Sequence, residues 1–170
     1  FFKGNQILGR KGTIGCVSLE ITQRCNLDCS LCYLSESSAL VTDMPIEELY
    51  RRLDEIINFY GPGTNVQISG GDPTLRDRGE LLAIVRYARK IGLHPALFTN
   101  GKKCSRELLE ELSEAGLSDV AFHVDLTQNL KGYETEADLN KLRSELIERA
   151  RGLPLLVIFN TTVHESNFKE

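Results

Sequence analysis

The chain has 170 residues, 41% of them hydrophobic, so it can bury a core, and one domain is the expected number. Its 24 acidic and 20 basic residues give a net charge of -4 without a basic block, which argues against a dedicated nucleic-acid-binding protein. No apolar run is long enough to span a bilayer and no signal peptide is visible, so we expect a cytoplasmic protein. The missing initiating Met suggests an excerpt of a longer protein.

Hydrophobic patterning predicts strands that alternate with helices along the whole chain. The expected elements, in order, are strand 16–22, helix 46–60, strand 65–69, helix 81–91, strand 95–99, helix 105–116, strand 119–124, helix 135–152 and strand 155–159. Strands alternating with helices lie parallel and are joined by right-handed crossovers. We therefore expect an α/β fold, a partial (β/α) TIM-like barrel of five parallel strands. We expect residues 1–15 to be an N-terminal lead-in and residues 16–170 to be a core truncated on its C-terminal side.

Three helix starts carry capping signals. Asp43 and Pro45 provide an N-terminal signal for the first helix. Ser105 is expected to cap the third helix, and Thr135, three residues before Asp138, resembles a capping box with an acid shorter than the usual Glu. These signals fix where the predicted helices begin.

The loop after the first strand carries the most informative pattern, Cys25, Cys29 and Cys32. Four thiolates would close the coordination of a four-iron cluster, whereas three leave one iron open to a substrate or cofactor. A disulfide, or zinc with a distant fourth ligand, remains an alternative. The odd count of 5 cysteines at low density argues against disulfides. For Cys16 and Cys104 we expect buried thiols.

Polar or glycine-rich segments follow every predicted strand. Parallel strands present their carboxyl ends at one rim of a barrel, where active sites form. The segments are Thr22-Gln23-Arg24 with the cysteines, Ser69 to Thr74, Thr99-Asn100-Gly101, His123-Val124-Asp125 and Asn160-Thr161-Thr162. We predict that together they build one site.

The glycine pair Gly70-Gly71 exposes backbone carbonyls and allows close approach of a ligand. Followed by the carboxylate of Asp72, these carbonyls would suit a protonated amine. Pro73 restricts Asp72 to an extended conformation and so aims it. The alternative is a strand-to-helix turn whose Gly and Pro only shape the backbone.

Two further segments have both a ligand-binding and a plain structural interpretation. Thr99 and Asn100 can hydrogen-bond a ribose, but Asn-Gly is also an ordinary turn dipeptide. His123 and Asp125 lie two residues apart on a predicted strand, so they share a face. If that face is the barrel lumen, both are available to a ligand; a core histidine with one hydrogen bond is the alternative.

The spacing Cys25-x-x-x-Cys29-x-x-Cys32, followed downstream by Gly70-Gly71-Asp72-Pro73, resembles the radical S-adenosylmethionine (radical SAM) enzymes. The likeness runs from the first to the fifth strand. It is strongest toward the branch of the molybdenum-cofactor GTP cyclase and the peptide-modifying enzymes. The resemblance implies that the five strands belong to a (β/α)6 core.

The resemblance also implies a reaction and its cofactors. Cys25, Cys29 and Cys32 would ligate a 4Fe-4S cluster whose open iron takes the amino and carboxylate groups of S-adenosylmethionine. Reductive cleavage would give methionine and a 5′-deoxyadenosyl radical that abstracts hydrogen from an unidentified substrate. That substrate is a small molecule, a peptide or a lipid, and the electron comes from a reductant such as flavodoxin or ferredoxin. The alternative is a non-catalytic iron-sulfur or zinc binding module on an α/β scaffold.

By the same resemblance, Gly70, Gly71 and Asp72 contact the amino end of S-adenosylmethionine, although Glu is commoner than Asp at the third position. Leu31 and Tyr33 would lie by the adenine. His123 stands where relatives often carry a serine near the ribose or carboxylate. With the two strand-end residues, the expected cofactor contacts are Leu31, Tyr33, Gly70, Gly71, Asp72, Thr99, Asn100 and His123.

Overall fold

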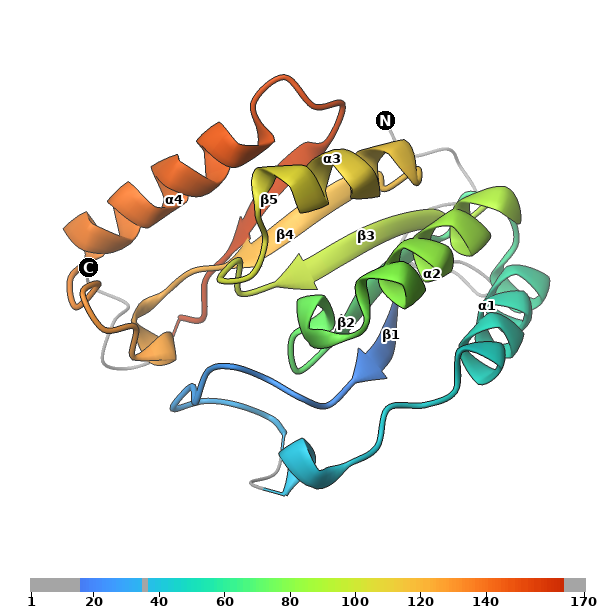
Figure 1. The fold of residues 1–170 in the computed structure, drawn as a ribbon, viewed down its shortest axis with the longest axis horizontal. Coiled ribbons are helices and arrows are strands. Elements are labelled where there is room, and N and C mark those ends of the chain that lie inside the picture. The colour runs from blue at the N-terminus through green and yellow to red at the C-terminus, as the bar shows by residue number, and fades with distance from the viewer. Residues whose placement is uncertain (1–15, 35–36, 164–170) are drawn as a thin grey trace.

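The computed structural model describes residues 16–34 and 37–163, so the expected lead-in 1–15 and the final residues 164–170 lie outside the described residues. Strands and α-helices alternate along this part of the chain (Figure 1). The elements are β1 (Cys16–Thr22), η1 (Ser38–Leu40), α1 (Ile46–Tyr60), β2 (Asn65–Gly70), η2 (Pro73–Leu75), α2 (Arg78–Lys90), β3 (His94–Thr99), α3 (Arg106–Glu114), β4 (Asp119–His123), η3 (Leu126–Gln128), α4 (Glu136–Ala150) and β5 (Leu156–Asn160).

The five strands form one sheet in the order β1-β2-β3-β4-β5, and every neighbouring pair is parallel. The register places Leu19 beside Ile68 and Phe122 beside Phe159. In Figure 1 the sheet curves, and α2 and α3 lie over the face that the helices cover. This arrangement confirms the predicted α/β partial barrel of parallel strands.

The hydrophobic core lies between the sheet and the helices. Apolar side chains of the helices are largely buried there, because removing apolar surface from water drives the packing. Fully buried examples are Leu49, Leu53, Ile84, Val85, Leu109, Leu112, Leu139 and Leu146. Among the residues that the structure describes, no helix is both long and apolar enough to cross a membrane.

Two of the three predicted helix caps are confirmed. The Ser105 side chain accepts a hydrogen bond from Leu108 N, and Thr135 accepts one from Asp138 N. The prediction for Asp43 is wrong: α1 begins after Pro45, and no side chain caps it. The fixed φ of Pro45 suits a helix start, and the Asp43 carboxylate has partners elsewhere.

The prediction of buried thiols is confirmed for Cys104 and wrong for Cys16. Cys16 is exposed because it opens β1, a strand at the edge of the sheet. Burial raises the pKa of Cys104 to about 12, so this thiol is protonated at neutral pH. All five cysteines are free thiols in the structure.

Candidate functional site

The cysteine loop (residues 23–45) joins β1 to α1 at the carboxyl end of the sheet. Cys25 and Cys29 are half-buried in this loop, and Cys32 is exposed. Burial, followed by the neighbouring Cys25 and Cys32, whose like charges would repel, raises the pKa of Cys29 to about 11. The loop therefore brings three free thiols near one another at the rim of the barrel.

The three thiols of this loop could serve as metal ligands. Three thiols on one loop, without disulfides, are the ligands that an iron-sulfur cluster uses. Within residues 16–34 and 37–163, no three His, Cys, Asp or Glu side chains are gathered closely enough to hold one metal ion.

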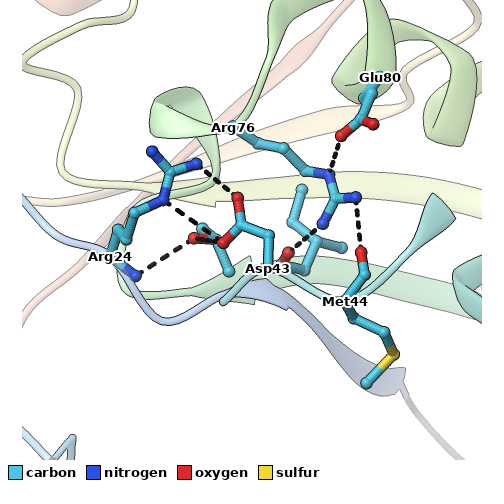
Figure 2. Close-up of polar contacts among 7 residues, drawn as sticks. Arg24, Asp43, Met44, Arg76 and Glu80 are labelled. Carbon is cyan, nitrogen blue, oxygen red and sulfur yellow. Dashed lines mark hydrogen bonds and ion pairs between the residues drawn. The ribbon is translucent and has the colours of Figure 1, made fainter. Parts of the chain in front are cut away.

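An ion pair closes the base of the cysteine loop (Figure 2). Arg24, at the start of the loop, pairs with Asp43, near its end. The Thr22 hydroxyl donates to the same carboxylate at 2.6 Å. Burial alone would raise the pKa of Asp43, but Arg24 and Thr22 outweigh it and hold that pKa below its usual range. The two ends of the loop are fixed together at β1.

A buried arginine, Arg76, lies beside this pair and was missed by sequence reasoning. Its side chain donates to the carbonyl of Ile21 at 2.6 Å and to that of Met44 at 2.7 Å, and its Nε donates to Glu80 at 2.8 Å (Figure 2). Arg76 thus joins the end of β1, the end of the cysteine loop and α2. No spacing in the sequence marks it, because its partners are backbone carbonyls far away in the chain.

The glycine pair makes room for the cysteine loop itself. Gly71 N donates to Thr22 O at 2.9 Å, and Asp72 N donates to Arg24 O at 2.8 Å. A Cβ at Gly70 would lie 1.9 Å from Thr22 O, and one at Gly71 would lie 2.2 Å from Arg24 O. Any side chain here would clash with backbone, so the glycines allow two strand-end loops to pack directly. This supports the interpretation in which they shape the backbone.

The Asp72 side chain is fully buried, with 0% exposure. One carboxylate oxygen accepts hydrogen bonds from the N–H of Thr74 at 3.0 Å and from its hydroxyl at 2.5 Å. The other accepts from the Thr99 hydroxyl at 2.8 Å and from Asn100 N at 2.9 Å. These four bonds match the acceptor capacity of a carboxylate. In this structure Asp72 ties the end of β2 to the end of β3.

Thr99 and Asn100 point to different surroundings. Thr99 is almost completely buried, and its hydroxyl is bound to Asp72. Asn100 reaches the cysteine loop: its Nδ2 lies 2.8 Å from Asn26 Oδ1 and 3.9 Å from Cys25 Sγ. Only the second of the two side chains contacts the cysteine loop directly.

His123 and Asp125 contact each other after β4. Asp125 is 1% exposed and accepts hydrogen bonds from Thr127, from Thr162 N at 2.6 Å and from the His123 ring at 2.7 Å. Burial alone would raise the pKa of Asp125, but these bonds, led by the one from His123, hold that pKa well below its usual range. The histidine therefore has the structural partner that the second interpretation expected.

Leu31 and Tyr33 flank the last cysteine and are largely exposed, at 55% and 70%. The Tyr33 hydroxyl donates to Glu20 at 3.1 Å and to Gly70 O at 3.3 Å. Tyr33 therefore lies against the end of β2, and Leu31 remains open to a ligand. The expected residues thus surround one rim, with Asp72 and Thr99 beneath it and the others at its surface.

The chain is similar to proteins of known activity. The model of the Radical SAM superfamily matches residues 19–165. A 7,8-dihydro-6-hydroxymethylpterin dimethyltransferase of Methanocaldococcus jannaschii is 29% identical over 94% of this chain and 32% of its own length. A PqqA peptide cyclase of Bradyrhizobium diazoefficiens is 30% identical over 91% of this chain and 40% of its own length. The chain thus spans well under half of these curated relatives.

Solved structures share the fold. Streptococcus suis SuiB bound to S-adenosylmethionine superposes with a TM-score of 0.62 and 15% identity, over 91% of this chain and 34% of SuiB. Native anSMEcpe with bound AdoMet and a Cp18Cys peptide gives 0.59 and 22% identity, over 86% of this chain and 42% of that one. Since the family model covers most of the chain, the chain belongs to the radical SAM superfamily.

Proposed function

We propose that this chain is the cluster-binding core of a radical SAM enzyme, in which Cys25, Cys29 and Cys32 hold a 4Fe-4S cluster. The observation that carries the proposal is the placing of three free thiols on one braced loop at the strand ends. Held there, the cluster would supply the electron for cleaving S-adenosylmethionine to methionine and a 5′-deoxyadenosyl radical able to abstract hydrogen from a substrate.

The residues of the rim orient the cofactor. We assign its amino end to the carbonyls of Gly70 and Gly71, next to the Tyr33 hydroxyl. The adenine lies by Leu31 and Tyr33, whose side chains are exposed beside the cysteines. His123 is assigned to the ribose or carboxylate end. It is half-buried and stays anchored by its own hydrogen bond to a carboxylate.

Asp72 and Thr99 are less available for direct contact with the cofactor. Contact of either side chain with the cofactor would require it to exchange an internal hydrogen-bond partner, because both are buried and bound to each other. Their surroundings favour a role in placing Asn100, which lies at the rim. Direct contact of Asp72 with the amino group remains a prediction that cofactor titration of Asp72 variants tests.

For the substrate we propose a peptide. The support is that relatives and structural neighbours carry names such as PqqA peptide cyclase and include SuiB bound to its precursor peptide SuiA. A small cofactor precursor is the next candidate, since another relative is named for a pterin. The electron would come from a flavodoxin or ferredoxin, and five free thiols suit the reducing cytoplasm.

Anaerobic reconstitution of the full-length protein tests the proposal. We expect at least one 4Fe-4S cluster per chain and, after reduction with dithionite, release of 5′-deoxyadenosine from S-adenosylmethionine. Cys29→Ser should lose the cluster, whereas Cys16→Ser, at an exposed thiol outside the loop, should keep it. A fully loaded protein that binds S-adenosylmethionine in a calorimeter but releases no 5′-deoxyadenosine would contradict the catalytic claim. Metal binding without any affinity for S-adenosylmethionine would support a non-catalytic module instead.

A further inference from the structure

The side chain of Asn100 makes a contact that the proposed function does not use. Asn100 directly follows β3, and its Nδ2 lies 2.8 Å from Asn26 Oδ1 and 3.9 Å from Cys25 Sγ. A side-chain amide carries two N–H hydrogens on one nitrogen. One hydrogen can therefore point to the Asn26 oxygen while the other points to the sulfur.

The orientation of this amide is fixed by its other end. Asn100 Oδ1 accepts a hydrogen bond from Lys102 N at 2.9 Å. Only the oxygen of the amide can accept from an N–H, so the nitrogen must be the atom that faces the cysteine loop. The reversed amide would place an oxygen opposite both the Asn26 oxygen and the sulfur.

The backbone of Asn100 is fixed as well. Its N–H donates at 2.9 Å to a carboxylate oxygen of Asp72, which is 0% exposed. The same oxygen binds the Thr99 hydroxyl at 2.8 Å. A buried carboxylate thus holds the main chain from which the Asn100 amide projects, and the amide itself is held by Asn26 and Lys102 N.

We propose that Asn100 tunes the cluster by donating an N–H···S hydrogen bond to Cys25, and that Asp72 is the positioning residue that holds Asn100 in place. This inference rests on the proposed function, which makes Cys25 a cluster ligand. Hydrogen bonds to cluster sulfurs are among the factors that set the reduction potential of iron-sulfur clusters. A donor at Cys25 stabilises the additional negative charge of the reduced state, so it raises the potential.

The test is an electrochemical titration of the reconstituted protein, followed by electron paramagnetic resonance. In Asn100→Leu, which keeps the size but removes the donor, we expect a midpoint potential more negative than in the wild type. The expected fall in the ratio of reduced to oxidised cluster at a fixed potential is up to about tenfold, or about 59 mV for a one-electron couple. Asn100→Asp keeps an acceptor for Lys102 N but adds negative charge, and should lie lower still.

Asn58→Leu is the matched control, since Asn58 is exposed on α1 outside the cysteine loop, and its potential should equal that of the wild type. An unchanged potential in either Asn100 variant at full iron content would overturn the inference. Loss of the cluster from both variants would also overturn it, because Asn100 would then be needed for assembly. A wild type without a cluster, or without 5′-deoxyadenosine release, would instead refute the proposed function.

Discussion

Two turns at the rim, residues 72–74 after β2 and 125–127 after β4, share one hydrogen-bond arrangement. In each, one oxygen of the leading aspartate accepts from the N–H and the hydroxyl of the threonine two residues on. The other oxygen accepts from a backbone N–H just beyond the next strand, that of Asn100 or of Thr162. Each buried carboxylate therefore fixes the end of the neighbouring strand as well as its own.

The two turns differ in their remaining partners. The fourth donor to the first carboxylate is the neutral Thr99 hydroxyl, whereas the second carboxylate receives the His123 ring. The first turn ends at the buried Arg76, which donates to two backbone carbonyls. The second ends at the exposed Asn129, in the left-handed conformation with φ 50°. The first turn is thus joined to β1 through Arg76, and within residues 16–34 and 37–163 no such hydrogen bond links the second turn to β1.

Both turns also reach the cysteine loop, by different groups. Beyond the first turn, the Asn100 side chain approaches Asn26 and Cys25 Sγ. From the second turn, the carbonyl of Thr127 accepts a hydrogen bond from Ser30 N at 2.8 Å. The first contact reaches a sulfur that the proposed function makes a cluster ligand, and the second holds the backbone of the loop. Two turns with the same hydrogen-bond arrangement therefore contact the cysteine loop through different groups, one through a side chain and the other through a backbone carbonyl.

The largest effect should come from replacing the two aspartates. Asp72→Asn and Asp125→Asn each place an amide among hydrogen-bond donors, so each should lower the free energy of unfolding by about 3 kcal/mol. Urea denaturation of the apoprotein measures this. Only Asp72→Asn should also shift the midpoint potential of the cluster, because only Asp72 holds Asn100. Equal potential shifts in the two variants would remove the distinction between the turns.

Arg76→Met should have the next largest effect. The substitution leaves the carbonyls of Ile21 and Met44 without their buried donor, at a cost of about 2 kcal/mol in unfolding free energy. Loosening of the loop should also make iron retention by the reconstituted protein less complete. Arg52→Met, at an exposed arginine on α1, is the control and should change neither quantity. Unaltered iron retention in Arg76→Met would show that the buried arginine does not brace the loop.

Acid should weaken the second turn through Asp125. Since its pKa is lower in the folded state than in the unfolded chain, its contribution is present above about pH 4 and is lost as the pH falls toward the folded-state value. We expect the stability difference between wild type and Asp125→Asn to shrink by on the order of 1 kcal/mol between pH 7 and pH 3.5. Urea denaturation across that range measures it. A difference that stays constant would contradict the assignment.

The smallest effect is expected at the end of the second turn. Asn129 has φ 50°, a region that glycine adopts freely, and its side chain is exposed. Asn129→Gly should therefore change the free energy of unfolding by only a few tenths of a kcal/mol. Thermal denaturation of the wild type and the variant measures the difference in stability. A loss above about 1 kcal/mol would mean that the side chain braces this turn, as Arg76 braces the other.

Local patterns in the sequence were enough to predict the strands and helices, but not the contacts between loops. Hydrophobic periodicity predicted the alternating strands and helices, and the caps at Ser105 and Thr135 depend on residues only three positions away. The role of Arg76 and the true partners of Asp43 could not be predicted in this way. Both depend on the crossing of loops that are 19 to 55 residues apart in the chain.

The glycine motif illustrates the same limit. Its spacing from the cysteines was enough to indicate the family and to place it at the rim. The physical reason for Gly70 and Gly71 could not be predicted from the sequence. The atoms that they accommodate, Thr22 O and Arg24 O, belong to the end of another strand. A motif can therefore be recognised before its physical cause is visible.

The central claim is that three cysteine ligands leave one iron open to S-adenosylmethionine. Electron paramagnetic resonance of the reduced, fully loaded protein tests it most directly, with and without saturating S-adenosylmethionine. We predict that the cofactor changes the spectrum of the cluster in the wild type, since it occupies the open iron. An identical spectrum, in protein shown by calorimetry to have bound the cofactor, would contradict the account.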